Sequence, residues 1–152
     1  MIDSQLAGFL GEGLGIHLGT RDEHRRPNGA RAVAVKVDED GRHLTVYVAK
    51  VAAGRVIPDL DANGQAAVDF GRPTDDRACQ VKGIFVDARP AKAAERTHVL
   101  AQWSAFLDNL ERIGIPRDNT VNWTTWPAVA IRLKVTAVFE QTPGPQAGTP
   151  LV

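Results

Sequence analysis

The stretch LTVYVAKVAAGRVIPDLDANGQAAVDFGRPTDDRACQVKG, from Leu44 to Gly83, decides the fold. Apolar residues alternate with other residues over its first positions, which predicts a half-buried strand. The next apolar residues recur at helical spacing, and Asn63-Gly64 ends that short helix. A second alternating run breaks after Gly71, and a third strand begins near Gln80. The order of strand, short helix, strand and strand therefore predicts a compact unit with polar groups at its ends.

The composition is that of one ordinary globular domain. The chain has 152 residues, 43% of them hydrophobic, and equal numbers of basic and acidic residues, 18 each. A net charge of zero argues against nucleic acid as the main partner, because a phosphate backbone attracts a basic excess. The single cysteine, Cys79, excludes an internal disulfide. No apolar run is long enough for a membrane span and no basic leader is evident, so we expect no membrane contact and a cytoplasmic protein.

The residues before this stretch predict one short helix and two strands. Asp3 or Ser4 can cap the helix, and the strands are expected at residues 15–20 and 31–37. The polar segment 21–29 between the two strands is expected to form a hairpin loop or turn. In the second strand, the alternation places Val33, Val35 and Val37 on one face.

The residues after this stretch predict one long helix and one long strand. Apolar residues at helical spacing run through 90–113, and alternation predicts the last strand at 129–139. We expect a single domain over residues 1–142, followed by an extended tail over 143–152. The fold class is mainly β (α+β): a six-stranded antiparallel split β-barrel with one long and two short helices outside. A two-layer α+β sandwich is the alternative.

This order of elements resembles the FMN-binding split barrel of the pyridoxamine 5'-phosphate oxidase-like proteins. The resemblance covers roughly residues 15–141 and is carried by Arg31, Arg55 and the segment from Gln80 to Gly83. It implies an FMN-binding flavoprotein, oxidoreductase-like and with unknown substrate, whose flavin or deazaflavin lies at the interface of a homodimer. The alternatives are a binding module without turnover and a scaffold with a degenerate site.

The resemblance also implies which residues hold the phosphate. Arg31 opens the strand Arg-Ala-Val-Ala-Val-Lys, so its guanidinium would meet the phosphate while the strand backbone through Val33 passes the ring. Arg55 would lie at the start of the helix after the third strand, but the hydroxyl and lysine common in the family's motif are missing. Lys50 could stand in as the second cation. A solvated strand-edge charge is the alternative for Arg31.

Other residues would face the ring. Tyr47 and Val48 end the third strand and are expected beside the ring or ribityl chain. The Gln80 amide can both donate to and accept from the pyrimidine edge, and Lys82 could approach the N1–C2=O side. Trp126 could cover one face of the ring. A plain strand aromatic, a polar outer strand face and a core tryptophan are the respective alternatives.

Several kinds of chemistry lack support. The four histidines show no metal-ligand spacing, so we expect no metal. Ser104 has no plausible triad, and no phosphate-binding glycine motif occurs. The tail from residue 141 lacks the Arg-x-His pair of the true pyridoxamine phosphate oxidase, so that reaction is not assigned. The sequence therefore assigns no catalytic residue.

Overall fold

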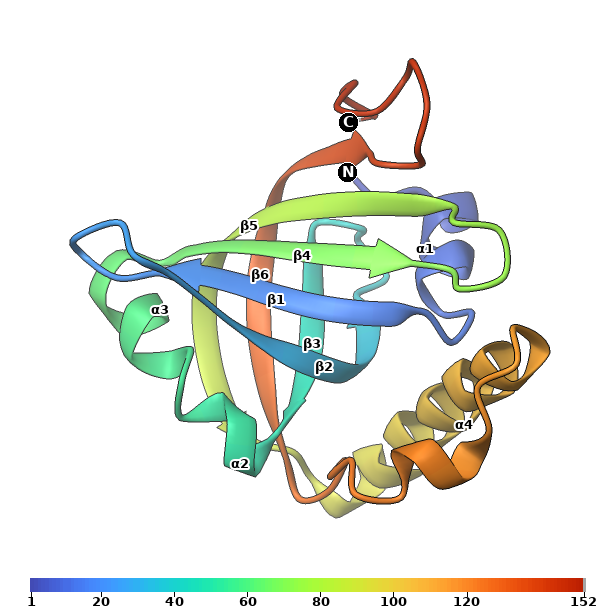
Figure 1. The fold of residues 1–152 in the computed structure, drawn as a ribbon. Coiled ribbons are helices and arrows are strands. Elements are labelled where there is room, and N and C mark those ends of the chain that lie inside the picture. Colours follow the sequence, from blue (N-terminus) through green and yellow to red (C-terminus); the bar gives the residue numbers. More distant parts are fainter. Residues whose placement is uncertain (152) are drawn as a thin grey trace.

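A computed structural model gives the fold, and it describes residues 1–151 (Figure 1). The strands are β1 (Gly15–Arg21), β2 (Pro27–Val37), β3 (His43–Ala49), β4 (Gln65–Gly71), β5 (Ala78–Pro90) and β6 (Ala128–Glu140). The helices are α1 (Ser4–Leu10), α2 (Lys50–Ala53), α3 (Ile57–Asn63) and α4 (Arg96–Arg112), with short 3-10 turns η1 (Ala93–Glu95) and η2 (Arg117–Thr120). All the strand pairs are antiparallel. The strand order β1-β2-β3-β6-β5-β4 closes on itself, which confirms the barrel expected from the sequence.

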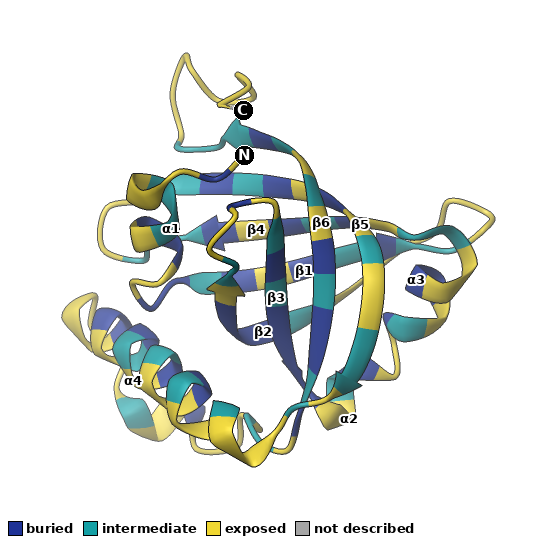
Figure 2. Ribbon diagram, turned by 180° about the vertical axis from the view of Figure 1, so that it is seen from behind, coloured by how far each residue is buried: buried dark blue, intermediate teal, exposed yellow. Residues whose placement is uncertain are grey.

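The apolar residues form two clusters rather than one. The larger cluster fills the barrel with inward side chains such as Leu18, Val46 and Leu133, each at most 1% exposed. The smaller cluster lies outside the barrel and joins Trp103 and Phe106 of α4 to residues of β2, β3 and β6. Figure 2 shows α4 on the outside of the barrel. Along β2, β3 and β6, residues of the larger cluster alternate with residues that face outward, because successive side chains point to opposite faces of a sheet.

A β-bulge in β2 changes the face of one expected residue. The register with β3 shifts between Ala32 and Ala34, so Val33 is the additional residue. Val35 points into the barrel, whereas Val33 belongs to the outer cluster. The expectation that Val33 and Val35 share one face was therefore wrong, because strict alternation does not anticipate an inserted residue.

The helices differ from the expectation in number and in their limits. The segment expected to hold one short helix holds α2 and α3, so three short α-helices accompany the long one. The long helix begins at Arg96 rather than near Pro90, because β5 extends to Pro90 and pairs there with Val129 of β6. The apolar stripe of α4 is buried at Val99, Trp103, Phe106 and Leu110, but Ile113 is 46% exposed.

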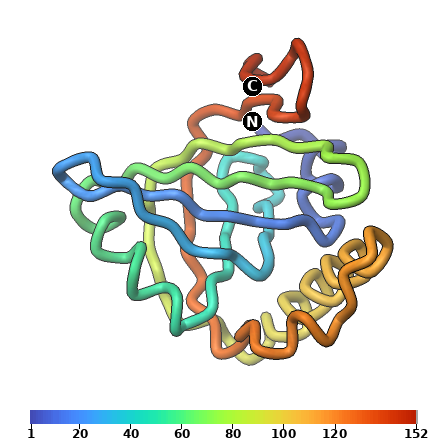
Figure 3. Tube along the Cα trace, viewed as in Figure 1, coloured from blue at the N-terminus to red at the C-terminus, as the bar shows by residue number. Residues whose placement is uncertain are grey.

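The two ends of the chain lie at the same end of the barrel (Figure 3). The described part of the tail turns back instead of running outward: the Leu151 N–H donates to the Val138 carbonyl at 2.7 Å, and Pro150 forms a bridge with Phe139. Among residues 1–151, no helix has both the length and the apolar character to cross a bilayer.

Candidate ligand-binding face

Four polar side chains from four neighbouring strands form one row across the outer wall of the barrel. Arg31 of β2 pairs in register with His17 of β1, which pairs with Asp69 of β4, which pairs with Gln80 of β5. Three strand spacings of about 4.8 Å separate the two ends of this row, a span of roughly 14 Å. No helix lies in front of β1 and β4 in Figure 1. We call this surface the open wall.

Arg31 stands at one end of the row without an anionic partner. Its guanidinium lies 4.5 Å from the ring centroid of Trp123 and 5.7 Å from that of Phe106. No carboxylate within residues 1–151 forms an ion pair with it. The side chain is partly buried, and this burial lowers the pKa of Arg31 from its ordinary value. A partly desolvated cation between aromatic rings is well suited to an anion.

A groove of about 250 Å³ begins at Arg31. The bulge residue Val33 and the α4 residue Trp103 form part of its wall, and Trp123 and Thr124 from the loop after η2 complete one side. Ala49, Val51 and Ala52 line it at the junction of β3 and α2. The bulge matters here, because it turns Val33 toward this groove and away from the barrel interior.

A second hollow, of about 410 Å³, lies on the same wall one step along the strands. Its floor is formed by Gly19, which has no side chain, and Ala67, which has a small one, so the strand backbones are accessible there. Lys82 lines it from β5, and Asn28 lines it from the start of β2. The Asn28 side-chain amide donates to the carbonyl of Arg55, so the α2–α3 junction borders this hollow.

The side chains in the middle of the row are His17 and Asp69. Partial burial, followed by the positive charge of Arg31, lowers the pKa of His17, while Asp69 acts in the opposite direction. This shift favours the neutral form of the imidazole. Asp69 accepts a hydrogen bond from the Gln80 amide nitrogen at 2.8 Å, which leaves the Gln80 carbonyl oxygen available.

Tyr47 lies elsewhere, under the start of α4. Its hydroxyl donates to Glu95 at 2.9 Å, and Glu95 also accepts two bonds from Arg89, each of 2.8 Å, and one from the Lys92 N–H. Chiefly through the Arg89 hydrogen bonds, the pKa of Glu95 falls to about 2. Burial, and secondly the bond to Glu95, raises the pKa of the Tyr47 hydroxyl. Tyr47, Arg89 and Glu95 therefore form one hydrogen-bonded group, which we call the polar clamp.

Three more of the expected residues lie away from the open wall. The Val48 side chain is 0% exposed inside the barrel, so the expectation that it faces a ring was wrong. Lys50 lines a different pocket, on the other side of the first turn of α2. Trp126 packs against the outer cluster with the Arg96 guanidinium 5.8 Å from its ring centroid, in line with the core alternative.

The open wall therefore brings together part of the expected set. Arg31 and Val33 share the groove, Gln80 and Lys82 lie on the same wall, and Arg55 borders the hollow. Sequence reasoning missed His17 and Asp69, because their proximity to Arg31 and Gln80 depends on strand register. The hairpin expected between the first two strands places His17 and Arg31 on neighbouring strands, but only its register shows that they are paired. The binding roles of all these residues stay predictions.

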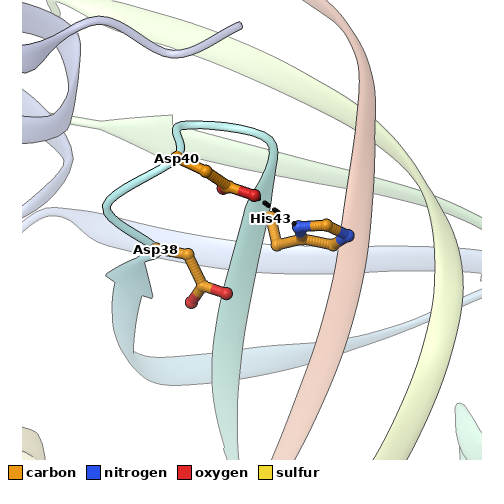
Figure 4. Close-up of side chains that lie close together, drawn as sticks. All are labelled: Asp38, Asp40 and His43. Atoms are coloured by element: carbon orange, nitrogen blue, oxygen red, sulfur yellow. Dashed lines mark hydrogen bonds and ion pairs between the residues drawn. The ribbon is translucent and has the colours of Figure 1, made fainter.

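The turn between β2 and β3 holds a cluster that the histidine spacing did not reveal. Ligand atoms of Asp38, Asp40 and His43 lie within 4.8 Å of one another (Figure 4). Each carboxylate already has a partner: Asp38 pairs with Arg132 at 2.6 Å, and Asp40 contacts the His43 ring at 3.2 Å. Both carboxylates of the cluster therefore take part in contacts within the protein.

Comparison with known proteins supports the fold. No family model matches the sequence, and no curated protein matches it. An F420 reductase structure is 20% identical over 86% of this chain and 93% of its own, with a TM-score of 0.58. HupZ of Group A Streptococcus is 17% identical over 97% of this chain and 100% of its own, with a TM-score of 0.57. An FMN-binding protein from Syntrophomonas wolfei is 13% identical over 88% of this chain and 81% of its own, with a TM-score of 0.55.

At these identities the likeness establishes the fold alone. The chain has the split-barrel fold of the pyridoxamine 5'-phosphate oxidase-like proteins, which confirms that part of the resemblance seen in the sequence.

Proposed function

We propose that this protein binds FMN, or a deazaflavin with a similar phosphate, on the open wall, and that a second subunit completes the binding site. The observation that carries this proposal is the partly buried guanidinium of Arg31, which lies against Trp123 and has no anionic partner within residues 1–151. Burial of a cation without a partner is unfavourable, and a bound phosphate would offset that cost.

The residues present fit the two ends of such a ligand. Arg31 would hold the phosphate, and Arg55, exposed beside the hollow, would supply a second positive charge. Gln80 and Lys82 would meet the pyrimidine edge, since the Gln80 carbonyl oxygen is available and no carboxylate in the described chain pairs with Lys82. The floor of small residues between them would allow a flat ring to approach the strands. The names of two fold neighbours, an F420 reductase and an FMN-binding protein, agree with such a ligand.

The openness of this site supports a homodimer. Ligand pockets enclose most of their ligand, whereas the groove at Arg31, of about 250 Å³, and the hollow beside it, of about 410 Å³, both lie open on the outer wall. A second copy placed over the open wall would cover the exposed side of the ligand, and symmetric pairs are the commonest assemblies. A monomeric mass in light scattering at micromolar concentration would contradict this part of the proposal.

When bound, the flavin would supply redox chemistry, and the protein would bind and orient it. His17, whose neutral form is favoured, lies in the middle of the row, so it is placed to exchange a proton with a ligand there. Binding without turnover is the second candidate. A scaffold with a degenerate site is the third candidate, and it is favoured by the phosphate motif, which has Ala53-Gly54-Arg55 where a hydroxyl and a lysine are common.

A titration with FMN and riboflavin tests the phosphate site. Arg31→Ala should weaken FMN binding by about 1.5–3 kcal/mol, the range for hydrogen bonds to charged groups, and should barely change riboflavin binding. Arg55→Ala should act in the same direction but less, because Arg55 is exposed. Arg42→Ala is a matched control, since Arg42 is exposed in the turn between β2 and β3, at the other end of β2 from the hollow.

The outcomes separate the alternatives. Equal losses for both ligands would indicate damage to the fold, and no loss for either would mean that Arg31 is a solvated charge. The absorbance spectrum of the freshly purified protein shows whether a flavin or deazaflavin is carried at all. Reduction of that ligand by nicotinamide nucleotides, followed by reoxidation, separates an oxidoreductase from a binding module.

A further inference from the structure

A third pocket, of about 300 Å³, lies at the opposite side of α2 from the groove at Arg31. It is bounded by α2 and α3 and by the ends of β5 and β6 that meet beside them (Figure 1). We propose that this pocket binds a small monocarboxylic acid, with its apolar body between the strand ends and its carboxylate on Lys50. This proposal does not depend on the flavin proposal, because the two sites share no lining residue.

The walls of the pocket are apolar and rigid. Apart from Lys50 and Arg89, the lining residues carry only hydrocarbon side chains: Ile57, Ala88, Pro90, Ala91, Pro127, Ala128 and Val129. The backbone that shapes it is held by hydrogen bonds, from the Lys50 N–H to the Pro127 carbonyl at 2.8 Å and from the Ala91 N–H to the Ala128 carbonyl at 2.9 Å. A preformed apolar pocket with a small number of polar groups is the usual form of a small-molecule site.

The charges at the rim of this pocket indicate the charge of the ligand that it would bind. The Arg89 guanidinium is held by Glu95 in a two-bonded ion pair and is therefore already neutralised. No carboxylate within residues 1–151 forms an ion pair with the Lys50 ammonium, so one positive charge with three donors remains. One cation matches a monoanion, whereas a phosphate dianion would be left poorly compensated.

Hexanoate, hexylamine and acetate are the probes for this site. Hexanoate should shift the amide resonances around Lys50 and Ala128 in a saturable way. Acetate should bind far more weakly because it lacks the apolar body, and affinity should rise about fourfold per methylene group from butanoate to hexanoate, the increment for a buried CH₂. Hexylamine should not bind there, since its charge repels Lys50.

Two substitutions at Lys50 make the test sharp. Lys50→Met keeps the length of the side chain but removes its charge, and should weaken hexanoate binding about threefold to tenfold. Lys50→Glu should reverse the preference, so that hexylamine binds and hexanoate does not. Lys134→Met, at an exposed position on β6, is the matched control and should leave hexanoate binding unchanged.

A substitution within the pocket provides a second, independent measurement. Ala88→Leu should fill the space and abolish hexanoate binding while FMN titrates as in the original protein; if that variant fails to fold, the charge reversal at Lys50 still decides. Equal binding of hexanoate and hexylamine, or hexanoate binding that ignores both Lys50 substitutions, would overturn the proposal.

Discussion

Two walls of the same barrel face outward in different ways. Part of the wall formed by β2, β3 and β6 is covered by α4 and the segment before it, and there the outward side chains of Tyr47 and Ala130 are 1% exposed. The wall formed by β1, β4 and β5 has no such cover and, together with Arg31 of the neighbouring β2, carries the polar row from Arg31 to Gln80. The interior packing behind both walls is equally tight, with Val46 and Val68 at 0% exposure. The covered wall therefore adds stability, while the open wall is available for a ligand or a second subunit.

The largest expected effect concerns the covered wall. Trp103 is 9% exposed and lies with ring centroids 5.4 Å from Phe106 and 5.8 Å from Trp123. Trp103→Ala should lower the free energy of unfolding by about 3–5 kcal/mol, because it leaves a cavity under α4. Urea unfolding measures this. Leu100→Ala on the same helix should cost less than about 1 kcal/mol, because Leu100 is 38% exposed. Equal effects would show that α4 does not add the stability attributed to it.

The next largest effect concerns the polar clamp between the covered wall and the start of α4. Glu95→Gln should lower the free energy of unfolding by about 1–3 kcal/mol at pH 7, because Arg89 loses its ionic partner. The folded protein holds the Glu95 pKa at about 2, below the ordinary value of 4.5. The contribution of Glu95 is thus complete above about pH 4.5 and is lost as the pH falls toward 2.

Unfolding curves at a series of pH values check this dependence. The original protein and the Glu95→Gln variant should differ at pH 7 and converge as the pH approaches 2. Glu111→Gln is the control, because the Glu111 carboxylate pairs with Arg117 in an exposed position and should matter little. A difference that persists unchanged at low pH would contradict the role assigned to the Glu95 charge.

The smallest effect is expected on the open wall. Asp69 is exposed, and among the described residues its carboxylate accepts a side-chain hydrogen bond from the Gln80 amide alone. Asp69→Ala should change the free energy of unfolding by no more than about 0.5 kcal/mol, as for most surface substitutions. Thermal unfolding measures this, and a loss above about 1.5 kcal/mol would mean that the polar row serves the fold rather than a ligand.

Part of the candidate site followed from the sequence and part did not. The resemblance selected Arg31, Gln80 and Lys82, and the structure places these three on one wall. It also selected Tyr47 and Lys50, which lie at Glu95 and at the third pocket. Side chains on one strand can be assigned to faces from alternation, but contacts between strands depend on register, which alternation alone does not set.

Sequence by itself determined the six strands, the long amphipathic helix and the barrel class, because these depend on local periodicity and on the need to bury one face of each element. Tertiary structure alone decided the bulge that turns Val33 outward, the wall that α4 covers and the loop that places Trp123 on Arg31. These features depend on how closely packed surfaces fit once the barrel has closed. That fit is a property of residues distant in sequence, which no local pattern records.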